Sequence, residues 1–261
     1  MNTAETKMID ILEDLRKNYF VKAVKLEFEA EGTQPQEADA LNEIAKTADL
    51  DLTVKIGGCE AVRDIFDTKK LEAKTIIAPM IESPYALKKF VNAVKNIFEN
   101  IDDIRLFINI ETVTALKNFE DIVNSSYFKF VSGTTLGRGD LACSMGLNRE
   151  NVNCKEIFDI ANSISKNMKE KNKEFFIGGG VFSESLPFFK NLSYINGFET
   201  RKIVFDKNIL NLKNADEGII KAINFEIEWL KYKQKKFGII YAQDMKRLES
   251  LEKRERSFFH T

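Results

Sequence analysis

The sequence has few of the residues that most often mark a metal or covalent site. Its single histidine, His260, is the penultimate residue, and its three cysteines, Cys59, Cys143 and Cys154, show no CxxC spacing. Cysteines that are few, odd in number and scattered argue against a disulfide scaffold and against a zinc site. They favour a reducing compartment, so we expect a cytoplasmic protein.

Long hydrophobic runs and an imbalance of charge are also missing. No apolar stretch approaches the roughly 20 residues of a membrane span, and residues 1–16 are charged and helix-like, unlike a signal peptide. The 39 Lys and Arg side chains nearly cancel the 40 Asp and Glu side chains. This balance offers no basic field for nucleic acid or for an anionic membrane, so neither is expected as a partner.

What the sequence does contain is an alternation of short apolar runs with amphipathic segments. Strands are predicted at 21–29, 51–56, 75–81, 105–110, 128–132, 174–177 and 197–205. Helices are predicted at 4–17, 36–47, 60–67, 84–99, 112–123, 153–170 and 183–189. The alternation predicts a parallel sheet with helical crossovers, and 261 residues suit one TIM (β/α)8-type barrel. Because only seven strands are counted, either the first strand is atypical, its place taken by the N-terminal helix, or one strand has been missed.

A single barrel domain is therefore expected over residues 1–261. Its N-terminal helix, barrel core and C-terminal helices are predicted at 1–18, 20–206 and 215–256. The C-terminal segment is rich in Lys and Glu but has an apolar face that includes Ile219, Ile223 and Trp229. That face packs either on the outside of the barrel or against a second subunit, and the sequence leaves both alternatives open.

Two carboxylates each follow an apolar run. Glu111 follows the predicted strand 105–110, and Asp140 follows the glycine-containing stretch after 128–132. The carboxyl ends of parallel barrel strands meet at one rim, so we expect both side chains there. Two carboxylates at that rim make a natural site for Mg²⁺ or Mn²⁺, which prefer oxygen ligands and keep several waters. The alternative is that each only caps the helix that follows.

Three stretches, IAPMIES at 77–83, INIETVTALKN at 108–118 and GRGDLACSMG at 137–146, stand at predicted strand ends. In this order they resemble motifs of the HpcH/HpaI aldolase and citrate lyase β-subunit family, within the phosphoenolpyruvate/pyruvate barrel superfamily. The resemblance spans about residues 20–205. It implies a barrel that holds Mg²⁺ or Mn²⁺ through Glu111 and Asp140, acts on a pyruvate-like or oxaloacetate-like 2-oxo acid, and forms a homo-oligomer.

Lys55 ends the second predicted strand, where the family usually has an arginine that grips the substrate carboxylate. A lysine keeps the positive charge but loses the bidentate fork, so we expect Lys55 to bind an anion with altered geometry. A Schiff-base lysine is the chemical alternative. An exposed lysine without a catalytic role is the other alternative.

Glu27, Glu29 and Glu31 alternate along the first predicted strand, and a period of two places them on one face. The family's aldolases have a histidine base near this strand end, and this chain has none there. That departure favours the branch that resembles citrate lyase. Glu29 is a candidate base or orienting group. A charge network with basic side chains such as Arg201 is an equal alternative.

Four further residues are candidate substrate contacts. Glu82 precedes a helix and either contacts substrate or only favours the helix N-terminus. Gly137 and Gly139 let backbone amides approach an oxo acid closely, and the run 178–180 is either a second set of such amides or a plain turn. Arg201 either neutralises the acids of the first strand or binds a second substrate anion.

Three functions are compatible with these residues. The first is a metal-dependent carbon–carbon lyase or aldolase that acts through the enolate of a small 2-oxo acid, with a substrate free of coenzyme A slightly favoured. The second is a hydrolase or phosphate-transferring relative on the same barrel. The third is a non-catalytic binding protein that has lost the base. The carboxylate pair favours the first function, which we take as the prediction.

Overall fold

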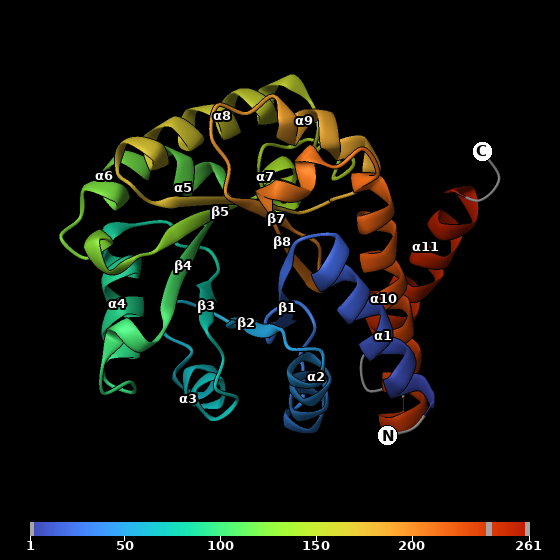
Figure 1. Ribbon diagram of the computed structural model, residues 1–261. Coiled ribbons are helices and arrows are strands. Elements are labelled where there is room, and N and C mark those ends of the chain that lie inside the picture. Colours follow the sequence, from blue (N-terminus) through green and yellow to red (C-terminus); the bar gives the residue numbers. More distant parts are fainter. Residues whose placement is uncertain (1–2, 239–241, 259–261) are drawn as a thin grey trace.

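The computed structural model describes residues 3–238 and 242–258, and eight strands within them form a closed barrel (Figure 1). The strands are β1 Val21–Glu27, β2 Asp51–Lys55, β3 Thr75–Ala78, β4 Arg105–Ile110, β5 Gly133–Gly137, β6 Glu174–Gly178, β7 Gly197–Glu199 and β8 Ile203–Asp206. Each strand pairs with the next one, and β8 closes the barrel on β1. The predicted TIM-like α/β barrel is confirmed.

The fifth strand does not lie where the sequence placed it. Residues 128–132 were expected to form it, but Phe128–Phe130 form the 3-10 helix η2 and the strand is Gly133–Gly137. An added Cβ at Gly133 would lie 2.5 Å from the backbone oxygen of Glu174 and 2.6 Å from the Phe107 ring. The true strand is thus poor in large apolar residues because its neighbours crowd it, and the adjacent aromatic run gives a false strand signal.

The eighth strand lies in the segment 197–205, which the sequence predicts as a single strand. It is two strands, β7 and β8, which pair antiparallel, and β8 also runs antiparallel to β1. β1 is present and pairs parallel with β2 over five residues, although its pairing with β8 shifts register between Val21 and Ala23. Of the two alternatives, a missed strand is therefore the right one. Because β8 runs backwards, the turn Thr200–Lys202 stands at the rim formed by the carboxyl ends of the parallel strands.

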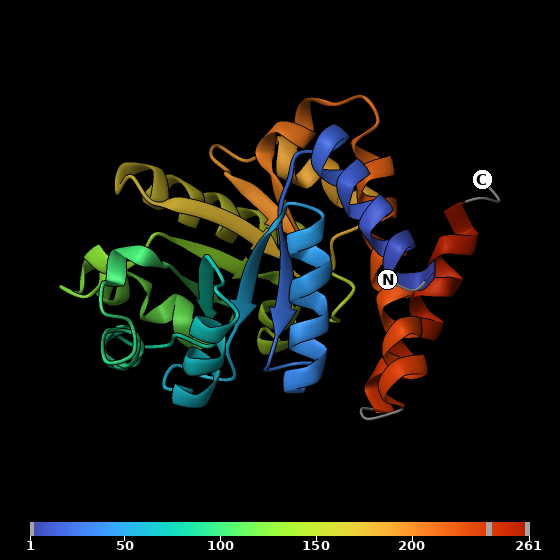
Figure 2. The same ribbon diagram turned by 60° about the horizontal axis from the view of Figure 1, so that its bottom comes forward.

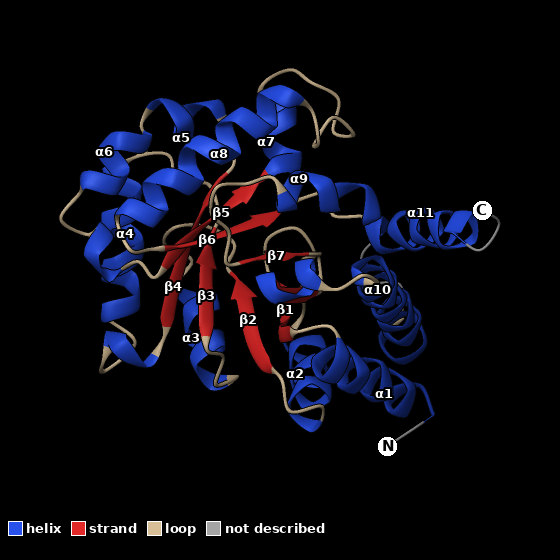
Figure 3. Ribbon diagram, turned by 45° about the horizontal axis from the view of Figure 1, so that its top comes forward, coloured by secondary structure: helices blue, strands red, loops and turns tan. Residues whose placement is uncertain are grey.

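Helices surround the barrel, as Figure 3 shows. They are α1 Thr3–Asn18, α2 Pro35–Thr47, α3 Val62–Lys70, α4 Pro84–Lys95, α5 Val113–Lys117, α6 Phe119–Asn124, α7 Arg138–Ser144, α8 Lys155–Glu170, α9 Leu186–Lys190, α10 Ala215–Phe237 and α11 Ala242–Phe258, with the 3-10 helices η1 Ile101–Asp103, η3 Ser183–Ser185 and η4 Lys207–Asn211. The short helix α7 lies in the glycine-containing stretch after 128–132, where the sequence predicts no helix. Within the described ranges, no helix combines the length and apolarity that crossing a membrane requires.

The C-terminal helices pack within the chain. Figure 2 shows α10 lying beside α1, with α11 folded back along it. The apolar face of α10 is buried there, and the Trp229 ring stacks on Tyr232 with centroids 5.6 Å apart. The side chains Ile219 and Ile223, for which packing and a subunit interface were both open, are thus covered by this chain itself.

Candidate active site

A cavity of about 990 Å³ opens at the rim where the carboxyl ends of the parallel strands meet. Seven of the eight predicted site residues line it: Glu29, Lys55, Glu111, Gly137, Gly139, Asp140 and Arg201. Glu82 is not part of the lining. Its carboxylate instead accepts a hydrogen bond of 2.5 Å from the Thr112 hydroxyl, and its backbone oxygen accepts one of 2.7 Å from Asn118 Nδ2.

Glu111 is the most enclosed of the candidate ligands. It follows β4 directly and is 1% exposed. Its Oε1 accepts a hydrogen bond of 3.0 Å from the Met80 amide, and its Oε2 accepts one of 2.8 Å from Asn109 Nδ2. Burial raises the pKa of Glu111, and the Lys55 ammonium, 3.5 Å from Oε2, opposes that shift only in part. The carboxylate is therefore held in one orientation with incomplete charge compensation.

Asp140 lies in the first turn of α7, nearer the mouth of the cavity. Its side chain is 41% exposed, and Arg149 Nη2 lies 3.5 Å from its Oδ1. Gly137, just before this helix, leaves room beside the buried carboxylate, since an added Cβ there would lie 2.4 Å from Glu111 Oε2. Glycine at 137 is therefore required by the close approach of the backbone to Glu111.

Two buried lysines form ion pairs with the acids of the first strand and its neighbours. Lys55 Nζ lies 2.7 Å from Glu29 Oε2, and Lys25 Nζ lies 2.8 Å from Glu27 Oε1 and 2.5 Å from Glu199 Oε1. Burial alone would lower the pKa of each lysine, but the surrounding carboxylates raise it overall. Both amines are therefore charged at neutral pH, which argues against the Schiff-base alternative, because that chemistry needs a neutral amine.

The oxygen donors at the cavity floor suit a hard divalent cation. Among the described residues, the four carboxylates of Glu27, Glu29, Glu111 and Glu199 form ion pairs within 4 Å only with the ammonium groups of Lys25 and Lys55. Two more buried oxygens that line the cavity, Asn109 Oδ1 and Thr135 Oγ1, have no hydrogen-bond partner among the described residues. In those residues no three His, Cys, Asp or Glu side chains converge as a complete ligand set. Glu111 and Asp140 fit Mg²⁺ or Mn²⁺ that keeps several waters.

The prediction that Glu27, Glu29 and Glu31 lie on one face of the first strand is confirmed only in part. β1 ends at Glu27, so Glu29 and Glu31 lie in the turn beyond it. Glu27 and Glu29 line the cavity, whereas Glu31 is buried against Lys202, with which it forms an ion pair. The predicted charge network therefore exists. Arg201 belongs to it, because with the two buried lysines it lowers the pKa of Glu27 to about 2 despite burial.

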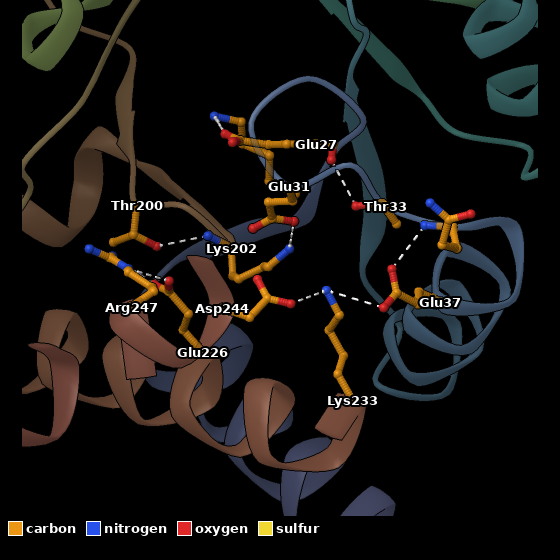
Figure 4. Close-up of polar contacts among 12 residues, drawn as sticks. Glu27, Glu31, Thr33, Glu37, Thr200, Lys202, Glu226, Lys233, Asp244 and Arg247 are labelled. Atoms are coloured by element: carbon orange, nitrogen blue, oxygen red, sulfur yellow. Dashed lines mark hydrogen bonds and ion pairs between the residues drawn. The ribbon is translucent and has the colours of Figure 1, made fainter. Parts of the chain in front are cut away.

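The C-terminal helices form one wall of the cavity, which sequence reasoning did not foresee. Arg247 of α11 donates two hydrogen bonds, of 2.7 and 3.1 Å, to the buried carboxylate of Glu226 on α10. Lys233 lies between Asp244 and Glu37, at 2.9 and 3.3 Å (Figure 4). These contacts fix α11 at the barrel rim. In the sequence the basic residues of α11 look like any solvated helix face, so no signal marked them.

Asn109 is another residue of the cavity that is not among the predicted site residues. It is 3% exposed within β4, and its Nδ2 donates to Glu111. A polar amide inside an otherwise apolar strand was the available signal, because a buried polar group needs a partner.

Residues 36–178 match the HpcH/HpaI aldolase/citrate lyase family. Three solved structures share the fold. They are an HpcH/HpaI aldolase from Desulfitobacterium hafniense DCB-2 (13% identity, 74% of this chain and 82% of that chain, TM-score 0.58), an HpcH/HpaI aldolase/citrate lyase family protein from Burkholderia cenocepacia J2315 (12%, 84% and 90%, 0.59), and the citrate synthase SbnG (15%, 78% and 84%, 0.59). A search of curated proteins finds no match. The family match covers 143 of the 261 residues, and this chain belongs to the HpcH/HpaI aldolase/citrate lyase family.

Proposed function

We propose that this protein is a metal-dependent carbon–carbon lyase or aldolase that acts through the enolate of a small 2-oxo acid, such as pyruvate or oxaloacetate. The supporting observation is that Glu111, Asp140 and Lys55 line one cavity at the barrel rim. Active sites of such barrels lie at this rim. Family membership favours the same chemistry.

Glu111 and Asp140 are the residues that would hold Mg²⁺ or Mn²⁺. When bound, such an ion polarises the ketone of an oxo acid and stabilises the negative charge of its enolate. The protein positions Glu111 through the Met80 amide and Asn109 Nδ2. Asp140, nearer the mouth, leaves the approach to the site open.

Lys55 and Glu29 supply the remaining roles. The Lys55 ammonium, next to Glu111, binds the anionic end of the oxo acid. Cleavage next to a hydroxyl requires a base that removes the hydroxyl proton while the electrons of the breaking C–C bond form the enolate. Glu29 lines the cavity, and its carboxylate is held 2.7 Å from Lys55 Nζ. We assign it as this base, in place of the histidine that the chain lacks.

Metal binding is the first test. Calorimetric titration of metal-free protein with Mn²⁺ should show one site per chain that oxalate or pyruvate tightens. Glu111→Gln and Asp140→Asn should each weaken Mn²⁺ binding about tenfold or more. Glu174→Gln is the matched control, because Glu174 is a carboxylate at the start of β6, at the opposite rim, paired with Arg105. Wild-type Mn²⁺ affinity in both site variants would refute the assignment.

Enolate formation can be tested without knowing the second substrate. In D₂O, metal-loaded protein should exchange the C3 hydrogens of pyruvate or 2-oxobutyrate for deuterium, which NMR follows directly. After it takes the hydroxyl proton, Glu29 returns a proton to C3 of the enolate, and the reverse of this transfer is the exchange measured here. Glu29→Gln should therefore slow the exchange while leaving Mn²⁺ affinity unchanged. A protein that binds Mn²⁺ and oxalate but exchanges the C3 hydrogens of neither pyruvate nor 2-oxobutyrate would contradict the lyase proposal and favour a binding role.

A further inference from the structure

Arg138 is a buried cation without a carboxylate partner among the described residues. It begins α7, is 0% exposed, and its guanidinium lies 4.9 Å from the ring centroids of Phe188 and Phe189. All of its acceptors are neutral oxygens. They are Gly178 O (3.4 Å), Gly179 O (3.0 Å), Gly180 O (3.3 Å), Val152 O (3.4 Å), Asn153 Oδ1 (2.6 Å) and Ser185 Oγ (3.4 Å). Such an arginine is costly to bury, so its retention calls for an explanation.

Three of these acceptors are consecutive carbonyls of the loop after β6. In a trans peptide the C=O and the next N–H point in opposite directions, and the described chain has no cis bond. The amides of Gly179, Gly180 and Val181 therefore point away from the guanidinium of Arg138. All three residues line the cavity, and within 3–238 and 242–258 their N–H groups have no acceptor.

The loop can take this shape only as glycine. Gly179 and Gly180 have φ of +78° and +60°, in the left-handed region that favours glycine. An added Cβ at Gly179 would lie 2.5 Å from the Gly139 amide nitrogen, and one at Gly180 would lie 2.9 Å from Val152 Cγ2. Gly178, in turn, pairs with Gly137 across β5 and β6. The loop that carries the three free amides therefore lies beside the start of α7, whose first turn contains Asp140.

We propose that the amides of Gly179, Gly180 and Val181 form a binding site for a substrate carboxylate, and that Arg138 is the positioning residue that fixes these amides from behind. The identity of the ligand as an oxo acid rests on the proposed function. Three N–H donors held on the side of the loop away from Arg138 need no reorganisation when an anion binds, and the uncompensated charge of Arg138 adds favourable potential.

The guanidinium of Arg138 combines two effects that a neutral side chain of the same shape would not. It donates hydrogen bonds to three carbonyls at once, and its positive charge attracts an anion on the far side of the loop.

Selective labelling isolates the loop in an NMR titration. Only three glycines follow another glycine in the sequence, Gly58, Gly179 and Gly180, so protein carrying ¹³C′,¹⁵N-glycine gives three coupled amide signals. Addition of oxalate to the Mg²⁺-loaded protein should move the Gly179 and Gly180 signals downfield. Gly58, which does not line the cavity, is the internal control. Oxalate binding that leaves both loop signals in place would overturn the amide site.

Substitution of the arginine tests the positioning role. Arg138→Met should weaken oxalate binding about tenfold while leaving Mn²⁺ affinity unchanged, and Arg138→Lys should restore part of the loss. A merely structural role would lower both affinities together, which would overturn the role of Arg138. The control is Arg105→Met, which removes an arginine near the Phe107 ring at the opposite rim. If Arg138→Met does not fold, the response of the wild-type Gly179 and Gly180 signals to oxalate tests the amide site on its own.

Failure of the proposed function can be distinguished from failure of the amide site. A wild-type protein that binds no Mn²⁺ or Mg²⁺ would refute the enzymatic proposal. In that case metal-free protein is titrated with oxalate alone: movement of the Gly179 and Gly180 signals keeps the anion site, and their immobility rejects it as well.

Discussion

At the scale of single residues, the site is built from paired lysines and carboxylates. Glu29, Lys55 and Glu111 form a continuous series of contacts of 2.7 and 3.5 Å. Motif position was enough to predict that these side chains face one cavity. The pairing itself was not predictable, because Lys25 and Glu199 meet across 174 positions of sequence, and only the closed barrel sets that contact.

Lys55→Met separates anion binding from metal binding. The change removes the ammonium that we assign to the oxo-acid anion, so oxalate affinity should fall about tenfold, equivalent to about 1.4 kcal/mol. Mn²⁺ affinity should stay equal or rise, because a positive charge 3.5 Å from Glu111 Oε2 is removed. Calorimetry on the metal-loaded protein measures both values. Lys22→Met, at an exposed lysine of β1, should behave as wild type; unchanged oxalate binding in Lys55→Met would reject the assigned role.

At the scale of elements, the cavity joins two parts of the chain. The family match ends at residue 178, whereas the β7–β8 turn, α10 and α11 complete the cavity wall beyond it. Helix starts are predictable from local chemistry, because Ser83 Oγ and Thr112 Oγ1 cap α4 and α5 and both residue types favour that position. The reversal of β8 was not predicted, although the polar stretch Glu199–Lys202 between Phe198 and Ile203 marks the turn, because two strands of three and four residues are too short for a clear periodicity.

The attachment of α11 should depend on Arg247. Arg247→Met leaves the buried Glu226 carboxylate without its partner, at a cost of about 1–3 kcal/mol in the free energy of unfolding. Glu226→Gln in the same chain should recover part of that loss, because the amide needs no counter-charge. Urea unfolding measures both, and Arg256→Met, on the same helix but exposed, is the control. A double variant no more stable than Arg247→Met would show that the pair does not hold the helix.

At the scale of the whole molecule, the barrel was predictable because alternating strand and helix patterns permit few closed arrangements. Because the carboxyl ends of parallel strands meet at one rim, it was also predictable that Glu111 and Asp140 line one cavity. The charge balance of the site was not predictable, since it depends on which buried groups pair. The charge balance of the site also affects how the stability of the entire domain depends on pH.

Acid unfolding should report that balance. The pKa of Glu27 is about 2 in the fold, against an ordinary 4.5, so its stabilising contribution is present above about pH 4.5 and is lost as pH falls toward 2. Glu31 and Glu111, whose pKa values burial raises, act with the opposite sign: the protonated form favours the fold, and that contribution is lost as pH rises through the folded pKa. The wild type should therefore lose stability below pH 4.5 through groups such as Glu27.

Glu27→Gln should make the free energy of unfolding depend less steeply on pH below pH 4.5. The variant should be less stable than wild type at pH 7, because one partner of Lys25 is lost while Glu199 remains. Between pH 4.5 and 2 its free energy of unfolding should fall less steeply, by up to about 1.4 kcal/mol per pH unit. Urea unfolding at several pH values gives both slopes, with the exposed Glu43→Gln as a control that keeps the wild-type slope. Equal slopes for Glu27→Gln and wild type would mean that Glu27 is not held ionised by the buried lysines, and the charge network would lose its central member.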